Sequence, residues 1–134
     1  MAAYVLMSNH FHLVVHFPNA SRISAFMRDL KSFSARMLRA WCAQQQDALR
    51  LVQQPKVWAR RFHSVPIFSV RLASKKVDYI HNNPVKPGLA ENPLEYENSS
   101  CRYFEFGDVG ALPVVHYTGL PWQLLAPAYP FVLL

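Results

Sequence analysis

The sequence has only two cysteines, and one part of it has no charged residues. Both features limit which class of protein this can be. Its two cysteines, Cys42 and Cys101, form no Cys-x-x-Cys pair, which excludes a disulfide framework and predicts ordinary thiols. No basic segment precedes the short apolar run Ala2 to Met7, so we expect no signal peptide and a cytoplasmic protein. We also expect no membrane span, because prolines interrupt the later apolar stretch.

The last part of the chain lacks charge altogether. Residues 109–134 contain no Lys, Arg, Asp or Glu, and four prolines exclude one long helix there. We divide the 134 residues into a folded domain at 1–108 and an uncharged, proline-rich tail at 109–134 without assigned structure. The 51% hydrophobic and 16% charged residues suit one folded core.

Positive charge is concentrated in the middle of the chain. Residues 22–76 hold twelve of the fourteen Lys and Arg residues but only two of the eight acids, Asp29 and Asp47. A basic segment beside an acidic remainder favours a surface for a polyanion, most simply a nucleic-acid backbone. The alternative is a solvated helix face that happens to be basic.

Local patterns predict strands first and helices later. Residues 4–7 and 11–17 are rich in β-forming residues and are interrupted by Ser8-Asn9, so we expect two strand pieces. Apolar residues then follow helical spacing from Ile23 to Trp41, with Phe33 and Trp41 expected in the core, and we expect this helix to end at about residue 51. A second helix is expected over 71–82, where Pro84 ends it.

Two motifs can carry chemistry. His10 and His12 are two apart, so a strand projects both imidazoles from one face, where they could bind one cation. Tyr79 lies on the second predicted helix, with Lys75 and Lys76 one turn before it and Asn83 one turn after. A tyrosine hydroxyl is a poor nucleophile unless positive charge favours its phenolate. Taken separately, both motifs are also compatible with ordinary packing roles.

Together the motifs resemble a known family. The strings Tyr4-Val-Leu-Met-Ser-Asn-His-Phe-His-Leu-Val-Val15, Trp58-Ala-Arg-Arg-Phe62 and Val77-Asp-Tyr-Ile-His-Asn-Asn-Pro-Val85 are similar to the REP-associated tyrosine transposases, which belong to the single-tyrosine HUH transposases. The resemblance covers residues 3–104. It implies an α+β, ferredoxin-like fold with an antiparallel sheet and helices on one side. The family's first strand and helix are missing here, so the tail or a second chain could fill the gap in the sheet.

The resemblance also implies an activity. His10, His12 and Asn83 would hold Mg²⁺ or Mn²⁺, and Tyr79 would cleave and rejoin hairpin-bearing single-stranded DNA through a 5′-phosphotyrosine. We expect a monomer or homodimer. The alternatives are a nucleic-acid-binding module without catalysis, a truncated and inactive copy, or a structural zinc protein. The predicted DNA contacts are basic and aromatic side chains: Arg28, Lys31, Arg36, Trp58, Arg60, Arg61, Phe62, Lys75, Lys76 and Lys86.

Overall fold

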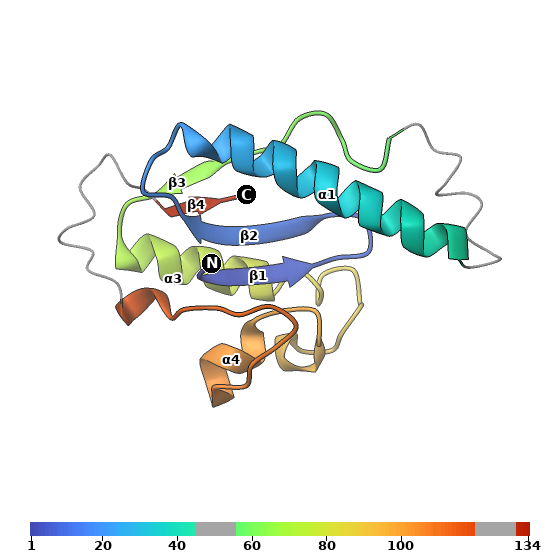
Figure 1. Cartoon of the computed structure of the whole chain (residues 1–134). Helices are drawn as coiled ribbons and strands as arrows, with labels where there is room; N and C mark the ends of the chain where they lie inside the picture. The colour runs from blue at the N-terminus through green and yellow to red at the C-terminus, as the bar shows by residue number, and fades with distance from the viewer. Residues whose placement is uncertain (45–55, 120–130) are drawn as a thin grey trace. The chain divides into compact units, whose positions relative to one another are not determined.

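The computed structural model describes residues 1–44, 56–119 and 131–134. The chain forms two compact units. The sheet unit comprises residues 1–20 and 64–134, and the helix unit comprises residues 21–63. The elements follow in the order shown in Figure 1. They are β1 (Ala3–Leu6), β2 (Phe11–His16), α1 (Arg22–Gln44), β3 (Val65–Ile67), α3 (Val70–His81), η1 (Pro93–Glu95), α4 (Cys101–Phe106), η2 (Tyr117–Gly119) and β4 (Phe131–Leu133).

The sheet confirms the expected α+β fold. Its strand order is β1-β2-β4-β3, and every neighbouring pair is antiparallel. β4 comes from the uncharged tail and lies between β2 and β3. The tail therefore supplies the strand that fills the sheet, which is one of the two ways in which the sequence suggested the gap could be closed.

Both edges of the sheet have features that limit further pairing. β3 is an edge strand, and Pro66, which has no backbone N–H to donate, lies in it opposite Val132. At the other edge, β1 is bridged by a later segment of the chain: Val5 forms an antiparallel bridge with Ser99, and the Leu6 N–H donates to the Asn98 carbonyl. Free strand edges template aggregation, so the 98–99 segment protects β1.

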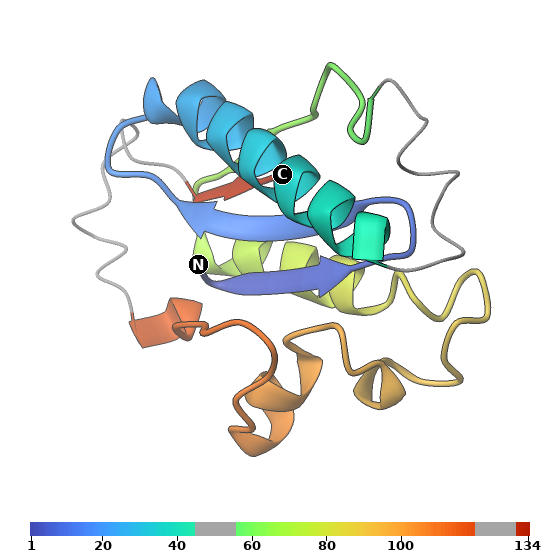
Figure 2. The same ribbon diagram turned by 45° about the vertical axis from the view of Figure 1, so that its right-hand side comes forward.

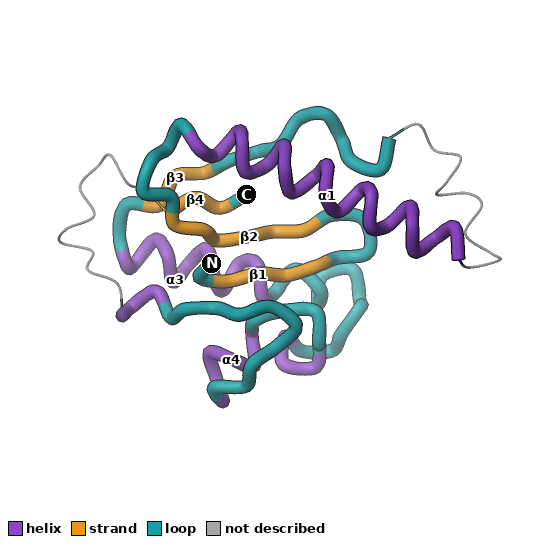
Figure 3. Tube along the Cα trace, viewed as in Figure 1, coloured by secondary structure: helices purple, strands orange, loops and turns teal. Residues whose placement is uncertain are grey.

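The second predicted helix forms almost where its pattern places it, as α3. It begins after Ser69, whose hydroxyl accepts a hydrogen bond from the Leu72 N–H, and its C-cap is Asn82. Beyond it the chain runs through turns and loops to η1 (Figure 3). The α3 helix packs against β1 and β2, as Figures 1 and 2 show.

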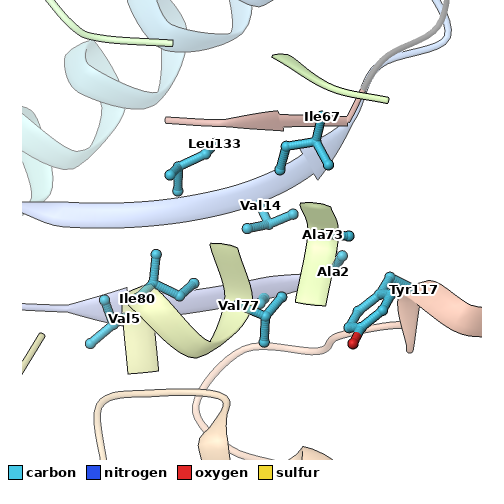
Figure 4. Packing of buried hydrophobic residues seen from close by; sticks show 10 residues of the cluster. Ala2, Val5, Val14, Ile67, Ala73, Val77, Ile80, Tyr117 and Leu133 are labelled. Atoms are coloured by element: carbon cyan, nitrogen blue, oxygen red, sulfur yellow. The ribbon is translucent and has the colours of Figure 1, made fainter. Parts of the chain in front are cut away.

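The core of the sheet unit lies between α3 and the sheet. Its buried side chains come from every strand, from α3 and from η2, and nine of them are labelled in Figure 4. Ala73, Val77 and Ile80 occupy helix positions that share one face, which they turn toward Val14 of β2 and Val5 of β1. Burial of this apolar face fixes the rotation of α3 about its axis. It thereby also fixes the directions in which the other side chains of the helix point.

The helix unit consists of α1 and the segment 56–63. The first predicted helix is present, although its predicted end near residue 51 lies outside the described residues. Met27 and Cys42 are buried, whereas Phe33 and Trp41 are 58% and 59% exposed. The expectation that these two aromatics lie in the core is therefore wrong, because helical spacing identifies an apolar face without showing what covers it. In the part of the chain that the structure describes, no helix is long and apolar enough to cross a membrane.

Candidate active site

The two histidines lie side by side at the start of β2. His12 is the second residue of the strand, and His10 lies in the tight turn that joins β1 to β2, where the Met7 N–H donates to the His10 carbonyl. Their ring centroids are 5.3 Å apart, with the rings close to perpendicular. His12 is half-buried and shares its strand face with Val14, whereas His10 is exposed. The pair can therefore face one ion at the rim of the sheet.

Tyr79 meets this pair from the helix. Because Val77 and Ile80 point into the core, Tyr79 lies at the edge of the helix–sheet contact and remains 45% exposed. Its ring centroid lies 6.0 Å from that of His12. Residues 67 positions apart in sequence thus meet, which joins the two motifs into one site.

Positive charge surrounds the tyrosine, but its main source differs from the expected one. The Lys86 ammonium lies 4.5 Å from the Tyr79 ring centroid, and the Lys76 ammonium lies 5.9 Å from it. Lys75 is exposed on α3. Lys86 reaches the ring because residues 84–89 form a turn, closed by hydrogen bonds from Gly88 N–H to the Val85 carbonyl and from Leu89 N–H to the Pro84 carbonyl.

Asn83 follows the helix and has an unusual environment. Its backbone N–H donates to the Ile80 carbonyl, and its side-chain Nδ2 is buried without a hydrogen-bond partner among the described residues. A buried amide without a partner is rare in proteins. The opposite amide orientation would place Oδ1 at the same position, where an oxygen could accept a donor or coordinate a cation.

The donor atoms of His10, His12 and Asn83 are of types that bind divalent cations. Two imidazoles and one amide oxygen match Mn²⁺ well, whereas Mg²⁺ prefers oxygen ligands alone. Within residues 1–44, 56–119 and 131–134, three or more His, Cys, Asp or Glu side chains do not cluster at any point. A metal site here therefore depends on Asn83 or on ligands supplied by the substrate.

The histidines have defined hydrogen-bond partners. His10 Nδ1 is 2.6 Å from the side-chain oxygen of Asn9. Burial lowers the pKa of His12, and the charges of His10 and Lys86 lower it further, while a hydrogen bond to the Leu134 backbone opposes them. A depressed pKa keeps His12 in the neutral form that binds metals.

A buried polar network secures the helix that carries Tyr79. His81, two residues further along, is 5% exposed, and its Nε2 lies 2.8 Å from the Ser100 hydroxyl. That hydroxyl also accepts a hydrogen bond from the Tyr4 N–H of β1. Burial lowers the pKa of His81 to about 4. From the sequence, His81 is expected to be a structural or surface residue, but its link to Ser100 is not visible there, because contacts between residues so far apart leave no local pattern.

The helix unit contains the other predicted DNA contacts and gathers them around one groove. A cavity of about 630 Å³ lies along α1 and the segment 56–62. Arg28, Arg36 and Arg60 line it, as do Trp58 and Phe62. Arg39 and Lys56 line it as well, although the sequence analysis did not single them out. Arg61 lies between the lining residues Arg60 and Phe62 in the sequence, and its side chain is exposed.

One predicted contact in this groove also has a structural task. The Lys31 ammonium donates to the carbonyls of Ala59 and Arg61, at 3.0 and 3.1 Å, and lies 5.5 Å from the Phe62 ring centroid. In addition, the Trp58 indole donates to the Ser34 hydroxyl. Both contacts tie the 58–62 segment to α1, so the aromatic rings of the groove are held in place.

The sequence of the chain matches a known protein family. A model of the family described as "Transposase IS200 like" matches residues 1–83. The chain belongs to the IS200-like transposase family. The chain is also similar to a protein of Haemophilus influenzae named "Putative REP-associated tyrosine transposase", with 28% identity over 99 residues. That match covers 73% of this chain but 56% of the relative, so the chain spans about half of that protein's length. No solved structure matches it.

Proposed function

We propose that this transposase cleaves and rejoins single-stranded, hairpin-bearing DNA through a covalent bond between Tyr79 and a 5′ phosphate. A divalent cation, Mn²⁺ or Mg²⁺, would be held by His10, His12 and Asn83. The observation that carries the proposal is the approach of the Tyr79 and His12 rings, with centroids 6.0 Å apart. A nucleophile and candidate metal ligands from separate parts of the chain meet there, as the implied chemistry requires.

The reaction balances without an external energy source. The Tyr79 oxygen loses its proton to solvent and attacks the phosphorus, forming an O–P bond as the bond from phosphorus to the 3′ oxygen breaks. The departing 3′ oxygen takes up a proton and becomes a free hydroxyl. When bound, the cation supplies Lewis acidity that withdraws charge from the phosphate and stabilises the leaving oxygen. The reverse attack by a 3′ hydroxyl rejoins DNA strands.

The transposase's own residues prepare this step. α3 holds Tyr79 at the edge of the sheet, and His81 and Ser100 fix the helix to β1. The Lys86 ammonium over the Tyr79 ring offers charge that attracts the phosphate. The exposed rim leaves room for a strand to enter, because Tyr79 retains almost half of its accessible surface.

The helix unit is proposed to bind the DNA strand. Its groove combines arginines for phosphates with Trp58 and Phe62 for unpaired bases, which is the combination that sequence-tolerant single-strand binding uses. This groove equally suits a second candidate function, a nucleic-acid-binding module without catalysis. The two functions differ in whether a covalent product forms.

The test is a strand-labelling experiment. Hairpin-bearing single strands labelled at the 3′ end are incubated with the transposase and Mn²⁺, and the products are separated on a denaturing gel. A 5′-phosphotyrosine leaves the 3′ label on the protein, whereas the same DNA labelled at its 5′ end yields only a shorter free strand. Retained binding without any protein-linked label supports the non-catalytic function instead.

A further inference from the structure

A second polar group lies close to each candidate metal-binding histidine. For His10 this group is Asn9, whose side-chain oxygen lies 2.6 Å from Nδ1. An amide oxygen can only accept a hydrogen bond, so with the Asn9 amide in this orientation a neutral ring carries its proton on Nδ1. Neutral His10 then presents Nε2 with a free lone pair.

For His12 the second group is the backbone of β4. Leu134 pairs with Leu13 through two hydrogen bonds, from Leu134 N–H to the Leu13 carbonyl at 2.8 Å and from Leu13 N–H to the Leu134 oxygen at 3.0 Å. This pairing brings the Leu134 backbone close to His12, the residue before Leu13. Since the Leu134 N–H is already used by Leu13, the backbone oxygen is the group of Leu134 that is left to accept a His12 ring proton.

We propose that Asn9 and the backbone oxygen of Leu134 are positioning groups that fix the tautomer and ring orientation of His10 and His12. Each accepts a proton from one ring nitrogen and leaves the other for a divalent cation. Protein metal sites commonly hold their histidines in this way, and losing such a partner costs about 10- to 100-fold in metal affinity. The inference rests on the proposed function, because it assumes that the pair binds a metal.

Two parts of the chain therefore serve the histidines in different ways. Asn9 acts from the β1–β2 turn, immediately before its histidine. Leu134 acts from the uncharged tail, whose strand β4 lies beside β2 along Val14 to His16. The tail strand thereby acquires a role at the metal site besides completing the sheet.

The first test reads the tautomers directly, without metal or DNA. Nitrogen-15 NMR of the imidazole rings, at a pH where they are neutral, distinguishes a protonated from an unprotonated ring nitrogen. The parent and Asn9→Asp should both carry the His10 proton on Nδ1. Asn9→Ala should lose that preference, because the exposed ring then hydrogen-bonds only to water. A parent with the His10 proton on Nε2 would overturn the inference.

The second test measures Mn²⁺ affinity by calorimetry. Asn9→Ala should lower affinity about tenfold, and Asn9→Asp should restore it, because a carboxylate is a stronger acceptor. A chain lacking Leu134 should also bind more weakly, because the backbone oxygen that positions His12 is then absent. Circular dichroism of each variant verifies that the sheet is intact.

The outcomes separate the two claims. Should the parent bind no Mn²⁺, the proposed metal site itself is wrong, and the positioning role fails with it. Should the parent bind Mn²⁺ and His10→Ala abolish binding, while Asn9→Ala and the chain lacking Leu134 bind normally, the positioning role alone is wrong.

Discussion

Lowering the pH should destabilise the protein through His81, the buried histidine that anchors α3. Its folded-state pKa is about 4, against 6.5 for an unperturbed side chain, and burial is the cause. In the unfolded chain His81 therefore becomes protonated as the pH falls below 6.5, whereas in the folded chain it becomes protonated only near pH 4. The free energy of unfolding should fall as pH falls between these values and change no further below them.

The magnitude follows from the same two values. Each pKa unit corresponds to about 1.4 kcal/mol, so the loss contributed by His81 between pH 7 and pH 5 is about 2 kcal/mol. This is a large share of the stability of an ordinary domain. No discount for solvent screening applies, because the side chain is only 5% exposed.

Urea unfolding followed by far-ultraviolet circular dichroism at pH 7, 6 and 5 measures the effect. His81→Gln is the matched control, because a glutamine can still hydrogen-bond to the Ser100 hydroxyl and cannot take up a proton. Burial also lowers the pKa of His12 and His16, so both proteins should lose some stability. The parent should lose about 2 kcal/mol more than the variant. Equal losses in the two proteins would refute the assignment of the effect to His81.

Three further predictions concern the reaction and DNA binding. Affinity for single-stranded DNA should fall as salt concentration rises: a plot of log affinity against log salt concentration should have a slope of about −0.7 per phosphate neutralised. An affinity that does not change with salt would contradict the proposed polyanion-binding surface. His10→Ala or His12→Ala should abolish cleavage and weaken Mn²⁺ binding while the fold is retained. Asn83→Ala should have the same effects, but less strongly. Normal cleavage by both histidine variants would show that the proposed metal site is wrong. Lys86→Gln should slow adduct formation more than Lys75→Gln, because the Lys86 ammonium lies over the Tyr79 ring, and equal rates would assign Lys86 no special role.

Local sequence patterns predicted the elements that carry the site. Alternation in β2 and the apolar face of α3 are short-range properties, and the predicted helix 71–82 differs from α3 by one residue at each end. The two motifs were linked by family resemblance, and the ring contact between His12 and Tyr79 agrees with that link.

Features that depend on distant pairing could not be predicted in the same way. Phe131–Leu133 is a short apolar run in a proline-rich tail, and only its pairing with β2 and β3 makes it a strand. Likewise, Lys31 has the composition of a phosphate contact, yet its ammonium is hydrogen-bonded to two backbone carbonyls. A charge pattern shows that cations are present, but it does not reveal which of them already have partners.

The central claim is that Tyr79 forms the covalent bond to DNA, and the most direct measurement identifies the linked residue. The protein is reacted with 3′-labelled hairpin DNA and Mn²⁺, and the adduct is digested and mapped by mass spectrometry. Tyr103→Phe is the matched control, since it removes the hydroxyl of a tyrosine on α4 instead. The account predicts DNA on the peptide containing Tyr79, none with Tyr79→Phe, and the parent's yield with Tyr103→Phe. An adduct that persists in Tyr79→Phe, or a parent that forms none with any hairpin, would contradict it.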